Sequence, residues 1–328
     1  MPHLEPGQTN VTRPSLDVGT FVKERCGVGL DFTVLAGHAG LKNRIEVGRI
    51  QKLSLALAGY TQQIRKGRLQ IVGETEISYA SSLEPERRRS VFEEACKVPV
   101  TAFLITKGLS APSELLDAAE KHAVPVLWCG ERSSSVIDTV QRYLEERLAP
   151  RVRIHGTLLE VFGLGVLIQG ESGIGKSECA LEMIQRGHRL VADDVVEVRV
   201  LSQQVLMGMG TEALRHHMEL RGIGIVNIKD LFGVAAVRNR KRIELIVRLI
   251  RWDDSIQYDR LGLDERRTTL LSADVPYMEM PVASGRNVAI LLEVAARHSM
   301  LRRSGYNPAR DLVDRLDRDL LDCSGDDE

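Results

Sequence analysis

The sequence lacks the cysteine pattern of a disulfide framework or of a thiolate zinc site. Its 328 residues include five cysteines, an odd number, which are scattered and never spaced Cys-x-x-Cys. Secreted disulfide scaffolds and cysteine-ligated zinc sites both depend on regular or close cysteine spacing. We therefore expect reduced thiols in a reducing compartment, at Cys26, Cys96, Cys129, Cys179 and Cys323.

The chain also lacks an excess of charge of either sign and any long hydrophobic run. Lys and Arg number 44 against 45 Asp and Glu, which gives a formal net charge of -1; nucleic-acid binders usually carry a basic excess. The first thirty residues contain no uninterrupted apolar segment of the signal-peptide kind, and the apolar stretch 161–168 is too short to span a bilayer. We expect a cytoplasmic protein that binds neither nucleic acid nor membrane.

What is present suggests two α/β domains. Apolar residues make up 43% of the chain, which is enough for a core, and the length is typical of two domains. Residues 102–106 and 124–128 read as buried strands with a helix over 114–123 between them, so we predict a parallel βαβ unit. A helix from about residue 135 stops at Pro150. We predict an N-terminal α/β domain over residues 1–150 and a second domain over 151–328.

The second half alternates strand and helix patterns before it ends in two helices. We predict strands over 155–160, 165–169 and 190–194, a helix over 178–186, and mainly strands from there to about residue 280. The closing helices are expected over 287–303 and from Asn307, which is followed by Pro308 in the first helical turn.

A glycine-rich segment follows the strand predicted over 165–169. Residues 170–177 match G-x-x-x-x-G-K-[ST] at every fixed position. Glycines allow backbone N–H groups to converge on an anion, and the following helix adds the positive end of its dipole. Lysine supplies a full charge for the β- and γ-phosphates, and the serine hydroxyl can ligate Mg²⁺. The segment predicts a site for ATP with Mg²⁺, built from Gly170, Glu171, Ser172, Gly173, Ile174, Gly175, Lys176 and Ser177.

Two adjacent acids, Asp193 and Asp194, follow the glycine-rich segment, and Asp194 is 18 residues after Lys176. A helix and a returning strand between the lysine and the acids would bring this pair beside the glycine-rich segment. Adjacent residues on a strand point to opposite faces, so the two acids are expected to have different tasks. One would face the metal or the γ-phosphate, and the other a structural partner.

With these motifs the chain resembles the HPr kinase/phosphorylase family, bacterial enzymes that phosphorylate a serine of the phosphocarrier protein HPr and remove that phosphate. The resemblance rests on His155-Gly156, the run GESGIGKSECALEMIQRGHRLVADD over 170–194, and the segments 218–227, 258–262 and 281–287. Looser similarity at 57–60 and 148–150 extends it to about residues 20–315.

The resemblance implies roles for individual residues. It implies that residues 170–177 bind ATP or pyrophosphate, that Ser177 and Glu219 bind Mg²⁺, and that Asp194 accepts the serine proton and returns it in the reverse reaction. His155, Lys176 and Arg260 would be active-site residues, and the loop 281–286 would serve mainly dephosphorylation. Further motif positions expected at the site are Asp193, Arg221, Gly222, Asn227, Pro281, Gly285 and Arg286.

The same resemblance implies a phosphoenolpyruvate-carboxykinase-like core in the second domain, a homohexamer, and an N-terminal domain of open role, with regulation as one option. The chemistry agrees with these residue types, because a carboxylate can accept the proton of a serine nucleophile and an arginine can stabilise the transferring phosphoryl group. Ser284 departs from the family's usual proline, which leaves open the balance between the two activities.

Two other functions are also compatible with these motifs. A small-molecule kinase or carboxykinase-like transferase could use a related loop. A non-catalytic nucleotide sensor could also bind ATP, although it would have no need for a general base such as Asp194.

Overall fold

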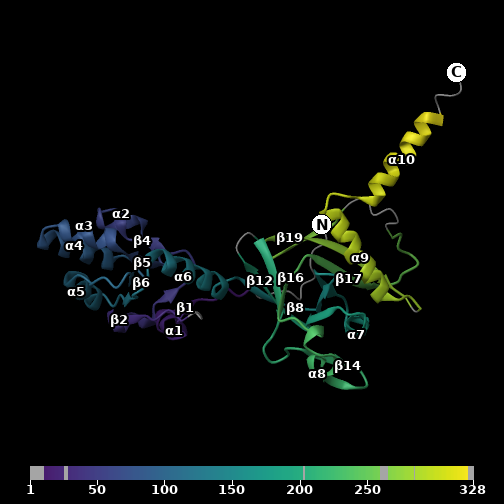
Figure 1. Cartoon of the computed structure of the whole chain (residues 1–328), viewed down its shortest axis with the longest axis horizontal. Helices are drawn as coiled ribbons and strands as arrows, with labels where there is room; N and C mark the ends of the chain where they lie inside the picture. Colours follow the sequence, from purple (N-terminus) through teal and green to yellow (C-terminus); the bar gives the residue numbers. More distant parts are fainter. Residues whose placement is uncertain (1–10, 26–28, 202–203, 259–264, 284, 324–328) are drawn as a thin grey trace. The chain divides into compact units, whose positions relative to one another are not determined.

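A computed structural model of the chain describes residues 11–25, 29–201, 204–258, 265–283 and 285–323. The chain separates into two compact units (Figure 1): the N-terminal unit, residues 13–150, and the C-terminal unit, which begins at Arg151 and includes Thr12 through an antiparallel bridge to Arg151. Both units mix helices and strands, so the predicted α/β class is confirmed. Among the described residues, none of the helices has both the length and the apolar content that a bilayer span requires.

The N-terminal unit is built on a five-stranded sheet in the order β2-β7-β6-β5-β4. Strands β4 to β7 are parallel and β2 is antiparallel to β7, so the predicted βαβ unit is confirmed as β6-α5-β7. The elements of this unit are β1 (Leu16–Asp17), α1 (Val18–Glu24), β2 (Thr33–Ala36), η2 (His38–Lys42), β3 (Arg44–Ile45), β4 (Gln51–Lys52), α2 (Ser54–Leu57), η3 (Thr61–Gln63), β5 (Leu69–Val72), α3 (Glu74–Ser82), α4 (Pro85–Lys97), β6 (Ala102–Ile105), α5 (Ser113–Lys121), β7 (Val126–Trp128) and α6 (Ser133–Arg147).

Helices cover both faces of this sheet. Alternate residues of β6 point to opposite faces, as the pleat of a strand requires. Phe103 and Ile105 pack with residues of helices α2 to α5, whereas Ala102 and Leu104 pack with residues of α1 and α6. Because both faces are buried, the strand reads as a continuous apolar run rather than an alternating one. Cys96 and Cys129 of this unit and Cys179 of the other are free and buried, while Cys26 lies outside the described residues.

The C-terminal unit contains a six-stranded sheet in the order β11-β9-β10-β17-β19-β18 and an antiparallel four-stranded sheet in the order β16-β13-β12-β8. Its elements are β8 (Arg151–His155), β9 (Thr157–Val161), β10 (Leu164–Gln169), α7 (Lys176–Gln185), β11 (Arg189–Ala192), β12 (Val195–Leu201), β13 (Val205–Gly210), β14 (His217–Leu220), β15 (Gly224–Asn227), α8 (Ile228–Phe232), η5 (Val234–Ala236), β16 (Arg240–Arg242), β17 (Leu245–Arg251), β18 (Arg267–Leu270), β19 (Ala273–Val282), α9 (Val288–Arg303) and α10 (Pro308–Cys323).

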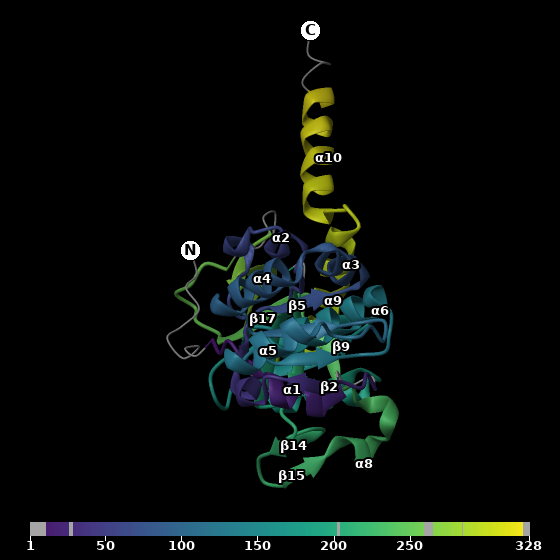
Figure 2. The ribbon, with the colours of Figure 1, turned by 90° about the vertical axis from the view of Figure 1, so that its left-hand side faces the viewer.

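The six-stranded sheet lies between helices and the second sheet. Val166 and Ile168 of β10 pack with residues of α7 and α9, while Leu167 between them packs with residues of β8 and β12. The hairpin β14–β15 and helix α8 lie together at one end of this unit (Figures 1 and 2). Met218 and Leu220 of β14 attach the hairpin to the cluster that contains α7.

The strand predicted over 155–160 is confirmed only from Thr157, where β9 begins. Gly156 separates two strands that lie in different sheets. β8 ends at His155 in the four-stranded sheet, and β9 begins at Thr157 in the six-stranded sheet. A Cβ atom on residue 156 would lie 2.6 Å from the carbonyl oxygen of Ile168, so the crossing from one sheet to the other requires glycine. This close approach involves a residue distant in sequence, so no local pattern indicates it.

Four strands of the six-stranded sheet end at the same edge. β10, β17 and β19 are mutually parallel, and β11 runs in the same direction because β9 lies antiparallel to both β11 and β10. Ligands of open α/β sheets bind at the carboxyl ends of parallel strands. At this edge lie residues 170–177 after β10, Asp193 and Asp194 after β11, Trp252 after β17, and residues 283 and 285–287 after β19.

Candidate active site

The glycine-rich loop joins the buried strand β10 to helix α7. Gly170, Gly173 and Gly175 adopt φ values of 149°, 82° and 100°, which are readily open only to glycine. Gly175 is also the N-cap of α7, and within the described part of the chain no side-chain hydrogen bond caps this helix end. The first N–H groups of α7 are therefore available to an anion, and the helix dipole favours negative charge at the same place.

Lys176 folds back over this loop. Its Nζ donates hydrogen bonds to the carbonyl oxygens of Gly170 and Glu171, each at 2.9 Å. The ammonium group is therefore held at the loop by two neutral acceptors, with no carboxylate hydrogen-bonded to it among the described residues. A full positive charge beside uncapped helix N–H groups is an arrangement suited to a polyphosphate.

Asp193 is buried and connects β11 to the glycine-rich loop. It is 3% exposed; Oδ2 accepts from Ser177 Oγ at 3.0 Å, and Oδ1 accepts from Thr157 Oγ1 at 2.6 Å. Burial raises the pKa of the Asp193 carboxyl, and the two hydroxyl donors oppose that effect. Thus a helix and a returning strand do bring the acid pair beside the loop, with Asp193 as the member that contacts it.

Asp194 points the other way, toward solvent. Its side chain is 64% exposed, and Oδ1 lies 3.7 Å from Nδ1 of His155, whose side chain is 83% exposed. The strand predicted through residue 194 ends at Ala192, because Asp194 has a φ of 63° and forms a turn in which its carbonyl oxygen accepts from Gly156 N at 3.0 Å. The two acids diverge as expected, but a left-handed turn, rather than strand alternation, separates them.

The hairpin β14–β15 approaches the loop through Arg221. A Cβ atom on Gly173 would lie 3.0 Å from Nη1 of Arg221, so the guanidinium packs directly on the loop backbone. Gly222 forms the hairpin turn with a φ of 83°, and Asn227 caps α8 by accepting from the N–H groups of residues 229 and 230. Glu219 is exposed on β14, and among the described residues no hydrogen bond or ion pair joins it to Ser177 or Asp193.

The neighbouring strands β17 and β19 add cations to the same edge. Arg251 forms an ion pair with Glu171 of the loop at 3.4 Å. The Arg286 guanidinium lies 5.6 Å from the centre of the Trp252 ring and donates to the carbonyl oxygen of Pro281 at 3.4 Å. Gly285 has a φ of 79°. Arg260 and Ser284 lie outside the described residues.

The oxygen donors at the loop fit a magnesium ion held mainly by substrate. The described residues contain no cluster of three or more His, Cys, Asp or Glu side chains arranged as a metal site. Mg²⁺ is usually bound by one or two protein oxygens together with phosphates and water. The Ser177 hydroxyl and the Asp193 carboxylate, 3.0 Å apart, supply such hard oxygen donors.

Comparison with known proteins places the chain in a family. Residues 17–144 match the model of the HPr Serine kinase N terminus, and residues 146–316 match that of the HPr Serine kinase C-terminal domain. An HPr kinase/phosphorylase of Geobacter sulfurreducens is 46% identical over 88% of this chain and 90% of its own length. The chain belongs to the HPr serine kinase family. A relative from Listeria monocytogenes with the same name is 40% identical over 90% of this chain and 93% of its own.

A solved structure titled HPr(Ser) kinase/phosphatase, from Coxiella burnetii, is 33% identical, with a TM-score of 0.45, over 49% of this chain and 97% of that chain.

In this member of the HPr serine kinase family, sequence reasoning missed three contacts at the site edge. Thr157 binds the buried acid, Arg251 pairs with the loop, and Glu182 of α7 binds Asn287 at 2.7 Å. Thr157 and Arg251 lie in apolar strand patterns that give no functional signal. Glu182 and Asn287 are 105 positions apart, and only the fold brings them together.

Proposed function

We propose that this protein transfers the γ-phosphoryl group of ATP to a serine of the phosphocarrier protein HPr. We further propose that it catalyses the reverse dephosphorylation, in which inorganic phosphate attacks phosphoserine and pyrophosphate is released. One observation supports this most directly: Ser177 of the glycine-rich loop is hydrogen-bonded to Asp193. The loop with its Lys176 and the acid pair 193–194 therefore lie at the same sheet edge. Membership of the HPr serine kinase family points to the same substrate.

The anion-binding part of the proposed site is the loop and the start of α7. Residues 170–177 would bind the β- and γ-phosphates of ATP, or pyrophosphate, through backbone N–H groups, with Lys176 neutralising charge. Mg²⁺, when bound, would neutralise phosphate charge. Ser177 would hold it directly, Asp193 would orient the Ser177 hydroxyl, and Glu219 would be a further ligand, as in the family motif.

Asp194 is proposed as the general base. The serine oxygen of HPr attacks the γ-phosphorus, the bond to the β–γ bridging oxygen breaks, and the serine proton passes to the Asp194 carboxylate. In the reverse reaction a phosphate oxygen attacks the phosphoserine phosphorus, and Asp194 returns the proton to the departing serine oxygen. The exposure of Asp194 suits an acid that must meet a residue of another protein, and exposed His155 lies beside it.

Several cations at the edge would stabilise the transferring group. Arg221 packs on the loop, and Arg286 follows β19 at the same edge. Arg260 is proposed for the same task from the family motif, together with a principal role of residues 281–286 in dephosphorylation. Gly222 and Asn227 would shape the hairpin that carries Arg221.

The wider organisation is proposed from the same family. Residues 151–328 would form the catalytic domain, with a phosphoenolpyruvate-carboxykinase-like core, and residues 1–150 a domain whose role could be regulatory. We propose a cytoplasmic homohexamer. The free, buried cysteines suit a reducing compartment, and burial raises the pKa of the Cys179 thiol to about 12, which makes it unreactive.

The test is incubation of the protein with HPr, Mg²⁺ and γ-labelled ATP, followed by a chase with inorganic phosphate. We expect label on a serine of HPr, and then its release as labelled pyrophosphate. An HPr variant with that serine replaced by alanine is the matched control. A small-molecule kinase would leave HPr unlabelled, and transfer without any pyrophosphate release on the chase would overturn the reverse reaction.

A further inference from the structure

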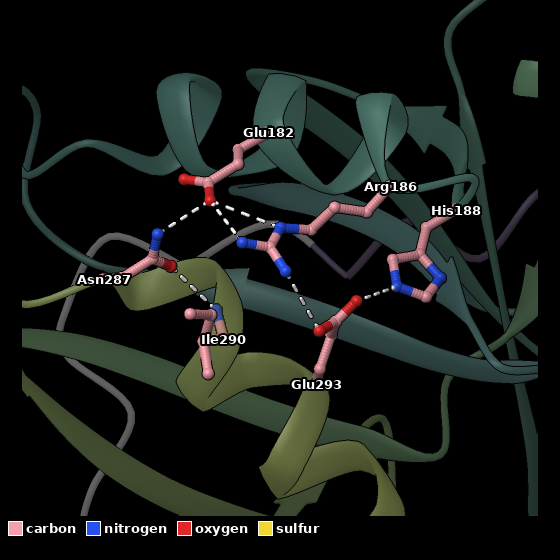
Figure 3. Close-up of polar contacts among 6 residues, drawn as sticks. All are labelled: Glu182, Arg186, His188, Asn287, Ile290 and Glu293. Carbon is pink, nitrogen blue, oxygen red and sulfur yellow. Dashed lines mark hydrogen bonds and ion pairs between the residues drawn. The ribbon is translucent and has the colours of Figure 1, made fainter.

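Helix α7, which begins in the glycine-rich loop, is joined to helix α9 by a series of polar contacts (Figure 3). Glu182 accepts from Asn287 Nδ2 at 2.7 Å and from Arg186 Nη2 at 2.8 Å. Arg186 Nη1 lies 3.4 Å from Oε2 of Glu293, whose Oε1 lies 2.9 Å from His188 Nε2. Beneath these contacts, apolar residues of both helices share one core cluster. The two helices are therefore held together along their facing sides.

Asn287 occupies a special place in this series because it uses both ends of its side-chain amide. Its Oδ1 accepts from Ile290 N at 2.9 Å and so caps α9, while its Nδ2 donates to Glu182 of α7. The hydrogen bond from Asn287 lowers the pKa of Glu182 most, and the one from Arg186 lowers it further, so Glu182 accepts these bonds as a carboxylate. An aspartate at position 287 could still cap α9, but it could not donate a hydrogen bond to Glu182, and it would place a second negative charge beside that carboxylate.

Asn287 also ends the segment that leads from β19 into α9 and follows Arg286 directly. Arg286 lies over Trp252 at the same sheet edge as the loop. The contact with Glu182 thus fixes the end of this segment to the helix whose first turn contains Lys176 and Ser177.

We propose that Glu182 and Asn287 are positioning residues that hold Arg286 at the site, and that the reverse reaction depends on them more than the forward reaction does. This inference rests on the proposed function. In the forward reaction the attacking group is a serine hydroxyl, which is uncharged and is carried by HPr. In phosphorolysis the attacking phosphate is a separate small anion that must be fixed against a second phosphate, so a correctly placed cation contributes more.

The decisive variant is Asn287→Asp, which keeps the cap of α9 and removes the donor to Glu182. We expect the ratio of phosphorolysis kcat/KM for phosphate to kinase kcat/KM for ATP to fall about tenfold. The double variant Glu182→Gln/Asn287→Asp exchanges acid and amide across the contact, so that the amide at position 182 donates to the carboxylate at position 287. It should restore the ratio to within about threefold of wild type. Asn307→Asp, the same change at the cap of α10, is the matched control and should leave the ratio unchanged.

A readout independent of activity separates this inference from the proposed function. Amide hydrogen exchange over residues 281–290 of the nucleotide-free protein should rise in Asn287→Asp and return in the double variant. Unchanged exchange in Asn287→Asp, an unchanged kinetic ratio, or a double variant as impaired as the single one would each overturn the inference. If the wild-type protein catalysed neither reaction, the proposed function would be overturned instead. The exchange measurement would still show whether the contact between Glu182 and Asn287 holds residues 281–290 in place.

Discussion

Each of the two units has a sheet in which several parallel strands end at one edge, but the polar groups at the two edges differ in their exposure and partners. In the N-terminal unit, buried polar groups at this edge satisfy one another: Glu76 accepts from Ser54 Oγ and from Gly73 N, and Thr106 Oγ1 lies 2.6 Å from Ser133 Oγ. In the C-terminal unit, the corresponding edge presents exposed Asp194 and His155, and a lysine bonded to backbone carbonyls of the glycine-rich loop.

The difference shows that topology alone does not decide what a sheet edge can bind. Both sheets bring loops together at the ends of parallel strands, where ligands of such folds bind. In the second unit, the glycine-rich loop, Lys176 and the exposed pair of Asp194 and His155 lie together at this edge, an arrangement that suits an anionic substrate. Substitutions at the first edge should therefore change stability, and substitutions at the second should change activity.

The largest effect is expected for Asp194→Asn, which removes the proposed base and keeps the shape of the turn. Kinase activity toward HPr should fall by about 10²- to 10⁴-fold, the usual contribution of general base catalysis. Because Asp194 lies outside the glycine-rich loop, ATP affinity measured by calorimetry should stay close to that of wild type. Near-normal phosphorylation by this variant would mean that another group accepts the proton.

A large change in stability without a change in chemistry is expected for Glu76→Ala in the N-terminal unit. Glu76 is 3% exposed and accepts from two donors, both of which would lose their partner. The variant should lose about 2–4 kcal/mol of unfolding free energy, as measured by urea denaturation of the full chain. Glu76→Gln can keep both contacts, since the serine hydroxyl can turn to accept, so it should lose much less. The activity per folded molecule should not change in either variant.

How far the site could be predicted from sequence depends on the range of each contact. The glycine-rich loop was placed correctly between a strand and a helix, because its four fixed positions and its flanking periodicity are all local. The break at Gly156 was not foreseen, because its cause is the carbonyl of Ile168 on another strand. Likewise, the divergence of Asp193 and Asp194 was expected, but the buried partner Thr157 and the left-handed φ of Asp194 come from tertiary packing.

A pH-dependent effect on stability should separate the buried acid from its exposed neighbour. Burial raises the pKa of Asp193, so its protonated form favours the folded state and this contribution is lost as pH rises through the raised pKa. Asp193→Asn should therefore gain in Tm relative to wild type as pH rises from about 4, the unfolded value. Asp194→Asn, with an exposed carboxylate, is the matched control; a Tm difference for Asp193→Asn that stays flat with pH would contradict the assignment.

The smallest effect is expected for Lys107→Ala at the first edge. Lys107 Nζ lies 2.6 Å from Glu74 Oε2, but both side chains are largely exposed, and water and salt screen such a pair. The hydrogen bond from Lys107 lowers the pKa of Glu74. Any stability that this pair contributes is therefore present above the pKa of Glu74 in the unfolded chain and is lost in acid. At neutral pH the Tm should match that of wild type within error, at low and at high salt. A loss comparable to that of Glu76→Ala would show that exposed charges, and not only the buried hydrogen bonds, hold this edge together.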